Sequence, residues 1–305
     1  MKPKLVIVLG PTAVGKSELA LDLAECIDGE IINADSQQVY RYMDIGTGKA
    51  SSRDRARIPH HLIDVVNPDE EFNAALFRRL ANEAVSTIRR RGKNTVVCGG
   101  AGLYLKALTH GLFSGPGQDP EIRRILEREI NERGLVALYQ RLVAIDPSVI
   151  SSIHPNDRQR IIRALEVFAI TGRPLSAWQK DHSFQEESFE TLTIGLMRER
   201  AELYEHINRR SAWMLQEGLL DEVRGLVEHG FGLDLKPLRS VGYRQMGAVI
   251  RGEMDLIRAA ENMKQETRRL AKRQLTWFRH DGEVRWYHPE REKQEIFHAV
   301  AEFLH

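Results

Sequence analysis

The chain has 305 residues, of which 29% are charged and 42% hydrophobic, and its formal net charge is +1. These values exclude a disordered chain, a protein with membrane-spanning helices and a protein drawn to nucleic acid by its overall charge. The length predicts two domains, or one large domain that carries an insertion.

The two cysteines, Cys26 and Cys98, have no metal-ligand spacing and lie within apolar or helical patterns. We expect both to be buried and to act as small hydrophobic residues. A chain with neither a disulfide framework nor a zinc site is typical of a reducing compartment, so a cytoplasmic location is predicted.

The first predicted element is a buried parallel strand over residues 4–9, followed by a loop that fits the pattern G-x-x-x-x-G-K-[ST]. In such loops, backbone amides and the N-terminus of the next helix attract phosphate oxygens. Lys16 would neutralise the phosphates, and the Ser17 hydroxyl would hold Mg²⁺. The sequence therefore predicts a site for a diphosphate or nucleotide. Its residues are Gly10, Pro11, Thr12, Ala13, Val14, Gly15, Lys16 and Ser17.

Strand and helix patterns alternate through the first 110 residues. Further strands are predicted at residues 30–33, 61–65 and 94–98, and helices at residues 16–26 and 74–91. This alternation predicts an α/β fold, a parallel sheet flanked by helices as in P-loop NTPases. Ligands of such folds bind at the carboxyl ends of the strands.

Two segments follow strands at that edge of the sheet. Asp35 could bind Mg²⁺ or act as a general base, but it could equally cap the next turn. The glycine-rich residues 99–104 would allow a close approach of the backbone to a ligand.

Residues 115–190 show no convincing strand pattern and are predicted to form a helical insertion domain. Pro120 begins a charged helical stretch, and Asp119 is its expected N-cap. A strand pattern returns at residues 191–196. The core domain is therefore predicted to comprise residues 1–114 and 191–305, with a helical C-terminal part.

A basic helical stretch lies near the end of the chain. Lys264, Arg268 and Lys272 are spaced four residues apart, so they share one helical face. Such a stripe could contact nucleic-acid phosphates or simply be solvated. We expect Trp277 and Phe278 to pack in the core.

Seven segments in order along the chain resemble tRNA dimethylallyltransferases. These enzymes transfer a dimethylallyl group from its diphosphate to N6 of adenosine 37, immediately 3′ of the anticodon, in tRNAs that read codons beginning with U. The product is N6-isopentenyladenosine. The segments are GPTAVGKS (residues 10–17), DSQQVY (35–40), PHHLIDV (59–65), GGAGLY (99–104), HPNDRQRIIRALEV (154–167), LRSVGYRQM (238–246) and AKRQLTWFR (271–279).

The resemblance implies a mechanism and its partners. Lys16 and Arg210 would stabilise the diphosphate leaving group, Asp35 would accept the proton of the adenine amino group, and Ser17 would help to hold Mg²⁺. The partners would be dimethylallyl diphosphate and a tRNA anticodon stem-loop. Separately from the resemblance, the sequence shows no coiled-coil pattern, so a monomer is the default expectation.

The resemblance also implies a set of tRNA-binding residues, among which Ala101 stands where the family usually has threonine. The insertion domain would contribute part of the set. Its members are Asp35, Ser36, Gln37, Gln38, Ala101, Arg123, Gln159, Arg160, Ile161, Ile162, Arg163, Arg239, Tyr243, Arg244, Lys272 and Arg273.

Two other functions fit parts of the pattern. A small-molecule kinase could use the same loop for ATP, but it would not need the long helical C-terminal part or its basic stripe. A non-catalytic, nucleotide-dependent RNA-binding protein would not need Asp35 beside the loop.

Overall fold

A computed structural model describes residues 2–112, 115–182 and 188–305. The chain forms two compact units, a core unit of Met1–Thr109 with Glu187–His305 and an insertion unit of His110–Glu186. The sequence predicts this insertion at residues 115–190, whereas the compact unit spans His110–Glu186.

The core unit is built on a six-stranded parallel sheet with the order β3-β2-β4-β1-β5-β6. β1 and β4 are central, and their residues are almost all buried, which explains their continuous apolar runs. The strands are β1 (Lys4–Leu9), β2 (Gly29–Asn33), β3 (His60–His61), β4 (Asn94–Gly99), β5 (Glu190–Leu196) and β6 (Arg285–Tyr287).

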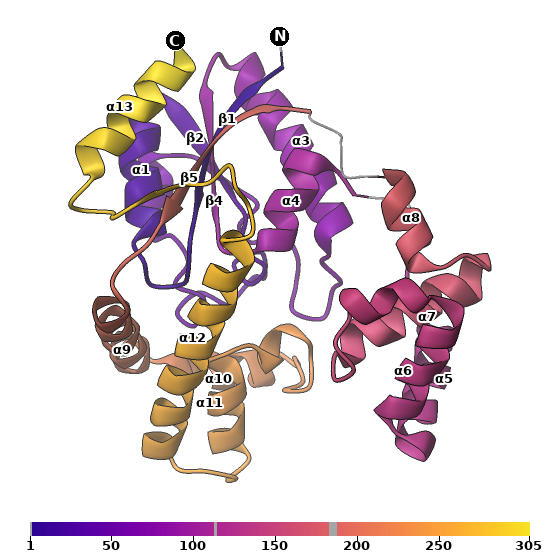
Figure 1. Cartoon of the computed structure of the whole chain (residues 1–305). Coiled ribbons are helices and arrows are strands. Elements are labelled where there is room, and N and C mark those ends of the chain that lie inside the picture. The colour runs from indigo at the N-terminus through magenta and orange to yellow at the C-terminus, as the bar shows by residue number, and fades with distance from the viewer. Residues whose placement is uncertain (1, 113–114, 183–187) are drawn as a thin grey trace. The chain divides into compact units, whose positions relative to one another are not determined.

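Helices cover both faces of this sheet (Figure 1). Val6 and Val8 pack with α1 (Lys16–Cys26) and α13 (Lys293–Leu304), whereas Leu5 and Ile7 pack with α3 (Ala74–Arg90) and α4 (Gly102–His110). Successive side chains of a strand point to opposite faces, so this one strand supports both layers. The predicted α/β fold is confirmed.

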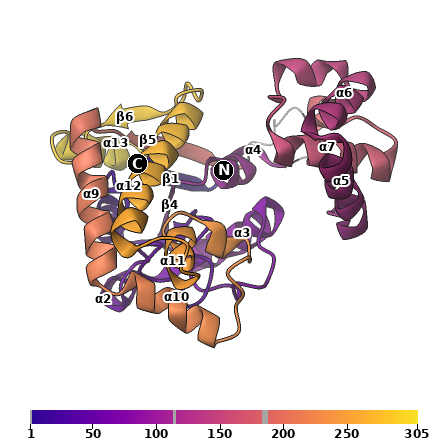
Figure 2. The same ribbon diagram turned by 90° about the horizontal axis from the view of Figure 1, so that it is seen from below.

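Four further helices of the core unit gather at the carboxyl ends of the strands (Figures 1 and 2). α12 packs against both α9 and α11, and α10 packs against α9 and α11. They create a wall opposite the phosphate loop. The helices are α9 (Arg200–Gln216), α10 (Leu219–Glu228), α11 (Tyr243–Ile250) and α12 (Leu256–Phe278).

The insertion unit is helical and has its own core, which includes Leu126, Leu138, Leu142 and Ile161. Asp119 caps its first helix by accepting hydrogen bonds from the amides of the first turn, as its position before Pro120 predicted. The helices are α5 (Pro120–Arg133), α6 (Leu135–Ile145), α7 (Arg158–Thr171) and α8 (Leu175–His182).

Three local predictions were wrong. The strand expected at residues 61–65 ends at His61, because Leu62 and Asp64 adopt positive φ angles of 63° and 55° that break an extended backbone. β6 was missed, since its three residues lie in a charged stretch. Cys26 is exposed at the end of α1, whereas Cys98 is buried as expected.

The described helices include none that is both long and apolar enough to cross a membrane. The remaining short helices are α2 (Ser52–Arg57) and the 3₁₀ helices η1 (Pro147–Ser151) and η2 (Pro237–Arg239).

Candidate active site

The phosphate loop connects β1 to α1 through two glycines with positive φ. Gly10 has a φ of 147°, and a Cβ there would lie 2.7 Å from the carbonyl oxygen of Leu196 on the neighbouring strand. Gly15 has a φ of 109° and immediately precedes the first helical residue, Lys16. The loop can therefore pass close to β5 and present the N-terminus of α1 to a ligand.

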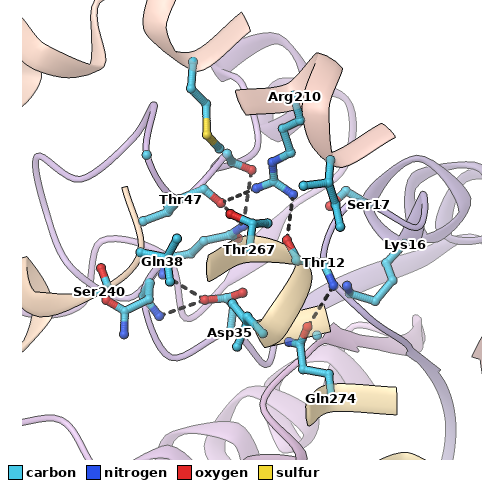
Figure 3. A pocket seen from close by; sticks show the side chains of 18 of the residues that line it. Thr12, Lys16, Ser17, Asp35, Gln38, Thr47, Arg210, Ser240, Thr267 and Gln274 are labelled. Carbon is cyan, nitrogen blue, oxygen red and sulfur yellow. Dashed lines mark hydrogen bonds between the residues drawn. The ribbon is translucent and has the colours of Figure 1, made fainter. Parts of the chain in front are cut away.

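One pocket, which we call the phosphate-loop pocket, lies between this loop and the C-terminal helices. Figure 3 shows Lys16, Asp35 and Arg210 around it, each from a different element. All three charged groups line this pocket. The lining polar residues are Thr12, Lys16, Ser17, Asn33, Asp35, Gln37, Gln38, Thr47, Arg210, Ser211, Ser240, Thr267 and Gln274.

The cations at the phosphate loop are held by uncharged partners. Lys16 Nζ donates a hydrogen bond to the Pro11 carbonyl at 2.7 Å, and Arg210 donates to Thr12 Oγ1 at 3.3 Å and the Thr47 carbonyl at 2.9 Å. Burial lowers the pKa of Lys16 to about 8, with Arg210 acting in the same direction and Asp35 against it. Burial likewise lowers the pKa of Arg210. Both groups would gain from an anionic ligand.

The Asp35 carboxylate follows β2 and uses one of its oxygens to shape the turn. Its Oδ1 accepts hydrogen bonds from the amides of Gln37 at 2.8 Å and Gln38 at 3.4 Å. Its Oδ2 has no hydrogen-bond partner among the described residues. The two roles left open by the sequence are therefore compatible, because one oxygen caps the turn and the other remains available for chemistry.

The lining of the phosphate-loop pocket also includes apolar side chains. These residues come from α9, the loop before α11, and α12. They were missed from the sequence because an apolar residue at helical spacing is normally a core residue. The members of this apolar wall are Ile207, Met214, Val241, Met263 and Leu270.

A second pocket, the aromatic pocket, shares Gln37 and Gln274 with the first. Trp277 lines it with 42% of its surface exposed, so the expectation that Trp277 packs in the core was wrong, whereas Phe278 is 3% exposed. Flat side chains and cations are suited to a nucleobase with its phosphates. Its other lining residues include Ser36, Tyr40, Ala101, Tyr104, Lys236 and Arg273.

Gln274 of α12 lies between the two pockets and joins them. Its Oε1 accepts a hydrogen bond from the Thr12 amide at 2.8 Å, and its Nε2 donates to the Gly100 carbonyl at 3.0 Å. A Cβ on Gly100 would lie 2.4 Å from Gln274 Nε2, and one on Gly102 would lie 2.1 Å from Trp277 Nε1. The glycines thus accommodate α12 and also line the aromatic pocket.

Comparisons with known proteins agree with this geometry. The family model described as IPP transferase matches residues 38–281. A tRNA dimethylallyltransferase of Geobacter metallireducens is 50% identical over 304 residues, covering 100% of this chain and 98% of the relative. A tRNA dimethylallyltransferase of Syntrophobacter fumaroxidans is 52% identical over 283 residues, or 93% and 83% of the two chains.

The chain belongs to the IPP transferase family. The crystal structure of a full-length tRNA isopentenylpyrophosphate transferase from Bacillus halodurans is similar, with a TM-score of 0.73, 39% identity, and coverage of 99% of this chain and 97% of that one. A eukaryotic dimethylallyltransferase, solved in the act of modifying tRNA, has a TM-score of 0.82 and 28% identity, with 99% and 79% coverage. These relatives give no support to the kinase alternative.

The basic stripe that we expected in this IPP transferase is partly neutralised. Lys264 pairs with Glu261, Arg269 pairs with Glu266, and Arg268 donates to Asn208. Lys272 and Arg273 are exposed and form no ion pair with a described residue. Both predicted tRNA-binding residues of α12 are thus available to meet phosphates.

In the insertion unit, two predicted tRNA-binding arginines share a buried carboxylate. Arg123 and Arg163 donate to Glu166, which is fully buried, at distances of 2.7–3.1 Å. Burial alone would raise the pKa of Glu166, but the hydrogen bonds from the arginines hold it below its usual value. Arg123 and Arg163 therefore also stabilise the fold, while Gln159 and Arg160 are exposed.

Three predicted tRNA contacts need correction. Ile161 and Tyr243 have no exposed surface, and Ile162 is 4% exposed. The isoleucines form the apolar side of α7, and Tyr243 packs beneath the phosphate-loop pocket. Their side chains serve the core in this structure, whereas Arg239 and Arg244 are exposed.

Proposed function

We propose that the protein transfers a dimethylallyl group from dimethylallyl diphosphate to N6 of the adenosine immediately 3′ of the anticodon, position 37, in tRNAs that read codons beginning with U. The observation that carries this proposal is the composition of the phosphate-loop pocket. Cations and the phosphate loop line this pocket together with the apolar wall. This arrangement suits a molecule with a diphosphate head and a five-carbon hydrocarbon tail.

The diphosphate end would lower the barrier to breaking the allylic bond. As the C–O bond breaks, the electron pair leaves with the diphosphate, and positive charge develops on the allylic carbon. Lys16 and Arg210 are fixed cations in a buried site, so they stabilise the leaving group without reorganising. The apolar wall excludes water, which would otherwise capture the allyl group.

Asp35 would serve as the general base. The N6 nitrogen of adenine attacks the allylic carbon, and the new C–N bond forms as the C–O bond breaks. The amino group then loses one proton, which Asp35 Oδ2 would accept while Oδ1 keeps its bonds to the turn. The product is N6-isopentenyladenosine, with diphosphate as the leaving group.

The aromatic pocket would receive the target base. An adenine stacked in a tRNA loop must be extruded before its amino group can react, at a cost of about a few kcal/mol. Trp277 offers a partly exposed flat surface, Tyr40 and Tyr104 line the same pocket, and Gln37 lines both pockets. The Oε1 atom of Gln37 is buried without a hydrogen-bond partner, so it can accept one from a base edge.

A magnesium ion fits this site as a companion of the substrate. Mg²⁺ prefers a few protein oxygens combined with substrate phosphates and water. The Ser17 hydroxyl offers an oxygen in the pocket, and Mg²⁺ would supply further charge neutralisation at the diphosphate. Among the described residues, the one cluster with metal-ligand potential is Glu202, His288 and Glu290, and Arg198 already bridges its two carboxylates.

Each unit would contribute exposed residues to RNA binding. Lys272, Arg273, Arg239 and Arg244 would meet the anticodon stem-loop from the core unit, and Gln159 and Arg160 from the insertion. Ser36, Gln38, Ala101, Arg123 and Arg163 remain proposed contacts near the base or its neighbours. We propose that the protein works as a monomer in the cytoplasm.

A transfer assay tests this function. Purified protein is incubated with labelled dimethylallyl diphosphate, Mg²⁺ and unmodified tRNA, and a parallel reaction contains labelled ATP and candidate small-molecule acceptors. We expect label from the prenyl donor in the tRNA. Phosphate transfer from ATP, without prenyl transfer, would overturn the proposal in favour of a kinase.

A further inference from the structure

A loop of residues 44–48 forms one wall of the phosphate-loop pocket through Gly46, Thr47 and Gly48. Its carbonyl groups hold two polar side chains of the site. Arg210 Nη2 donates to the Thr47 carbonyl at 2.9 Å, and Gln38 Nε2 donates to the Thr47 and Gly48 carbonyls at 3.3 and 3.2 Å. The orientation of the Arg210 guanidinium therefore depends on the position of this loop.

A single carboxylate, from Glu222 in the first turn of α10, holds the same loop from behind. Glu222 Oε2 accepts hydrogen bonds from the amides of Asp44 at 2.9 Å and Ile45 at 2.7 Å, and Oε1 accepts one from the amide of Gly46 at 3.1 Å. Three consecutive backbone donors thus converge on one charged group. Such charge-assisted bonds are stronger than those to a neutral acceptor.

Tyr243 completes the support from the neighbouring helix α11. Its hydroxyl donates to Glu222 Oε1 at 2.6 Å, and its ring has no exposed surface. The ring also fits closely against the loop, because a Cβ on Gly46 would lie 2.4 Å from Tyr243 Cε2. Glu222 therefore accepts four hydrogen bonds, two on each oxygen, although it does not line the pocket.

We propose that Glu222 is a positioning residue for the diphosphate site. It fixes the 44–48 loop so that the Thr47 carbonyl aims Arg210 at the bound diphosphate. This inference rests on the proposed function, in which Arg210 contacts that diphosphate.

Geometry and charge predict opposite effects when Glu222 is neutralised. Removing a negative charge near an anion site favours anion binding by simple electrostatics. Loss of the loop's anchor instead disfavours binding, because Arg210 is no longer held in place. In Glu222→Gln, one oxygen becomes an NH₂ donor, so two of the four hydrogen bonds are lost in either orientation of the amide. The sign of the change in affinity thus separates the two explanations.

The test is calorimetric titration of the full-length protein with inorganic pyrophosphate at fixed Mg²⁺. We expect Glu222→Gln to weaken pyrophosphate binding by about tenfold or more, as loss of a charged hydrogen-bond network would. The matched control is Asp221→Asn, which removes an exposed neighbouring carboxylate that pairs only with Arg224 among the described residues. Its binding should stay close to that of the unmodified protein.

A double-mutant cycle shows whether Glu222 acts through Arg210. In an Arg210→Ala background, adding Glu222→Gln should cause little further loss of affinity. Equal losses with and without Arg210 would overturn the inference, as would Glu222→Gln binding as tightly as the unmodified protein. If the unmodified protein did not bind pyrophosphate at all, the proposed function itself would fail.

A milder variant covers the case in which Glu222→Gln does not fold. Tyr243→Phe removes one donor to Glu222 and keeps the buried ring. It should weaken pyrophosphate binding less than Glu222→Gln does, and the loss should again depend on Arg210. Unchanged binding by a folded Tyr243→Phe protein, when Glu222→Gln cannot be measured, would count against the inference.

Discussion

At the scale of single residues, the two carboxylate oxygens of Asp35 have different environments. Oδ1 holds the turn at Gln37 and Gln38, and Oδ2 is open to the pocket. In Asp35→Asn, the amide oxygen can still accept the turn's hydrogen bonds, but the side chain can no longer accept a proton at neutral pH. We expect the rate of prenyl transfer to fall by about 10²- to 10⁴-fold.

Binding should be nearly unaffected by the same change. Titration of the Asp35→Asn protein with pyrophosphate and with a tRNA stem-loop measures this directly. A parallel loss of binding and turnover would mean that Asp35 is needed for the local structure and would contradict its role as the base.

Lys16 gives the diphosphate site a pH dependence of definite sign. Burial lowers its pKa to about 8, so its ammonium group is charged below pH 8 and becomes neutral above it. A neutral amine cannot attract an anion, and we expect the affinity for dimethylallyl diphosphate to fall above pH 8, by up to about tenfold per pH unit.

Lys16→Arg separates this effect from the titration of the ligand. Arginine stays charged throughout, so any remaining pH dependence belongs to the ligand or to other groups. The prediction is measured as the difference between the two proteins from pH 6.5 to 9.5, values chosen to bracket the pKa of about 8. Identical profiles would contradict it.

At the scale of secondary-structure elements, α12 contributes side chains to both pockets and carries exposed cations. Gln274 bonds to the phosphate loop, Met263 and Leu270 belong to the apolar wall, and Lys272 and Arg273 are exposed. One helix therefore lines the phosphate-loop pocket and also carries cations that are proposed to bind RNA.

The ion pairs of α12 predict which of its cations bind RNA. In a Lys272→Ala/Arg273→Ala protein, tRNA affinity should fall, and the slope of log affinity against log salt should lessen by about 0.7–0.9 per lost phosphate contact. The control is Lys264→Ala/Arg269→Ala on the same helix, where both cations already pair with glutamates. Equal slopes for the two double variants would contradict the prediction that Lys272 and Arg273 contact more RNA phosphates than the cations paired with glutamates.

The sequence predicted the elements more fully than the pocket they form. The phosphate loop, Asp35 and the parallel sheet follow from local patterns, because glycine spacing and buried β-branched runs have strong local signatures. The apolar wall could not be predicted, since Ile207, Met214 and Leu270 have the same helical spacing as core residues. Glu222 was missed because its partners in the 44–48 loop lie far from it in the sequence.

At the scale of the whole molecule, the core unit contains both of the pockets from which the function is proposed. The phosphate loop at the carboxyl end of β1 and the helices α9 and α12 line the phosphate-loop pocket, and the aromatic pocket adjoins it. The insertion unit has a separate hydrophobic core, and α7 carries the exposed Gln159 and Arg160. In the chain, the insertion unit lies between α4 and β5 of the core unit.

The most direct test of the central claim maps the product on the RNA. Unmodified tRNA with an adenosine immediately 3′ of its anticodon is treated with the protein and dimethylallyl diphosphate, then digested and analysed by mass spectrometry. We predict N6-isopentenyladenosine at that single position, and none when the adenosine is replaced by guanosine. An unmodified adenosine there, with the protein folded and pyrophosphate bound, would contradict the account.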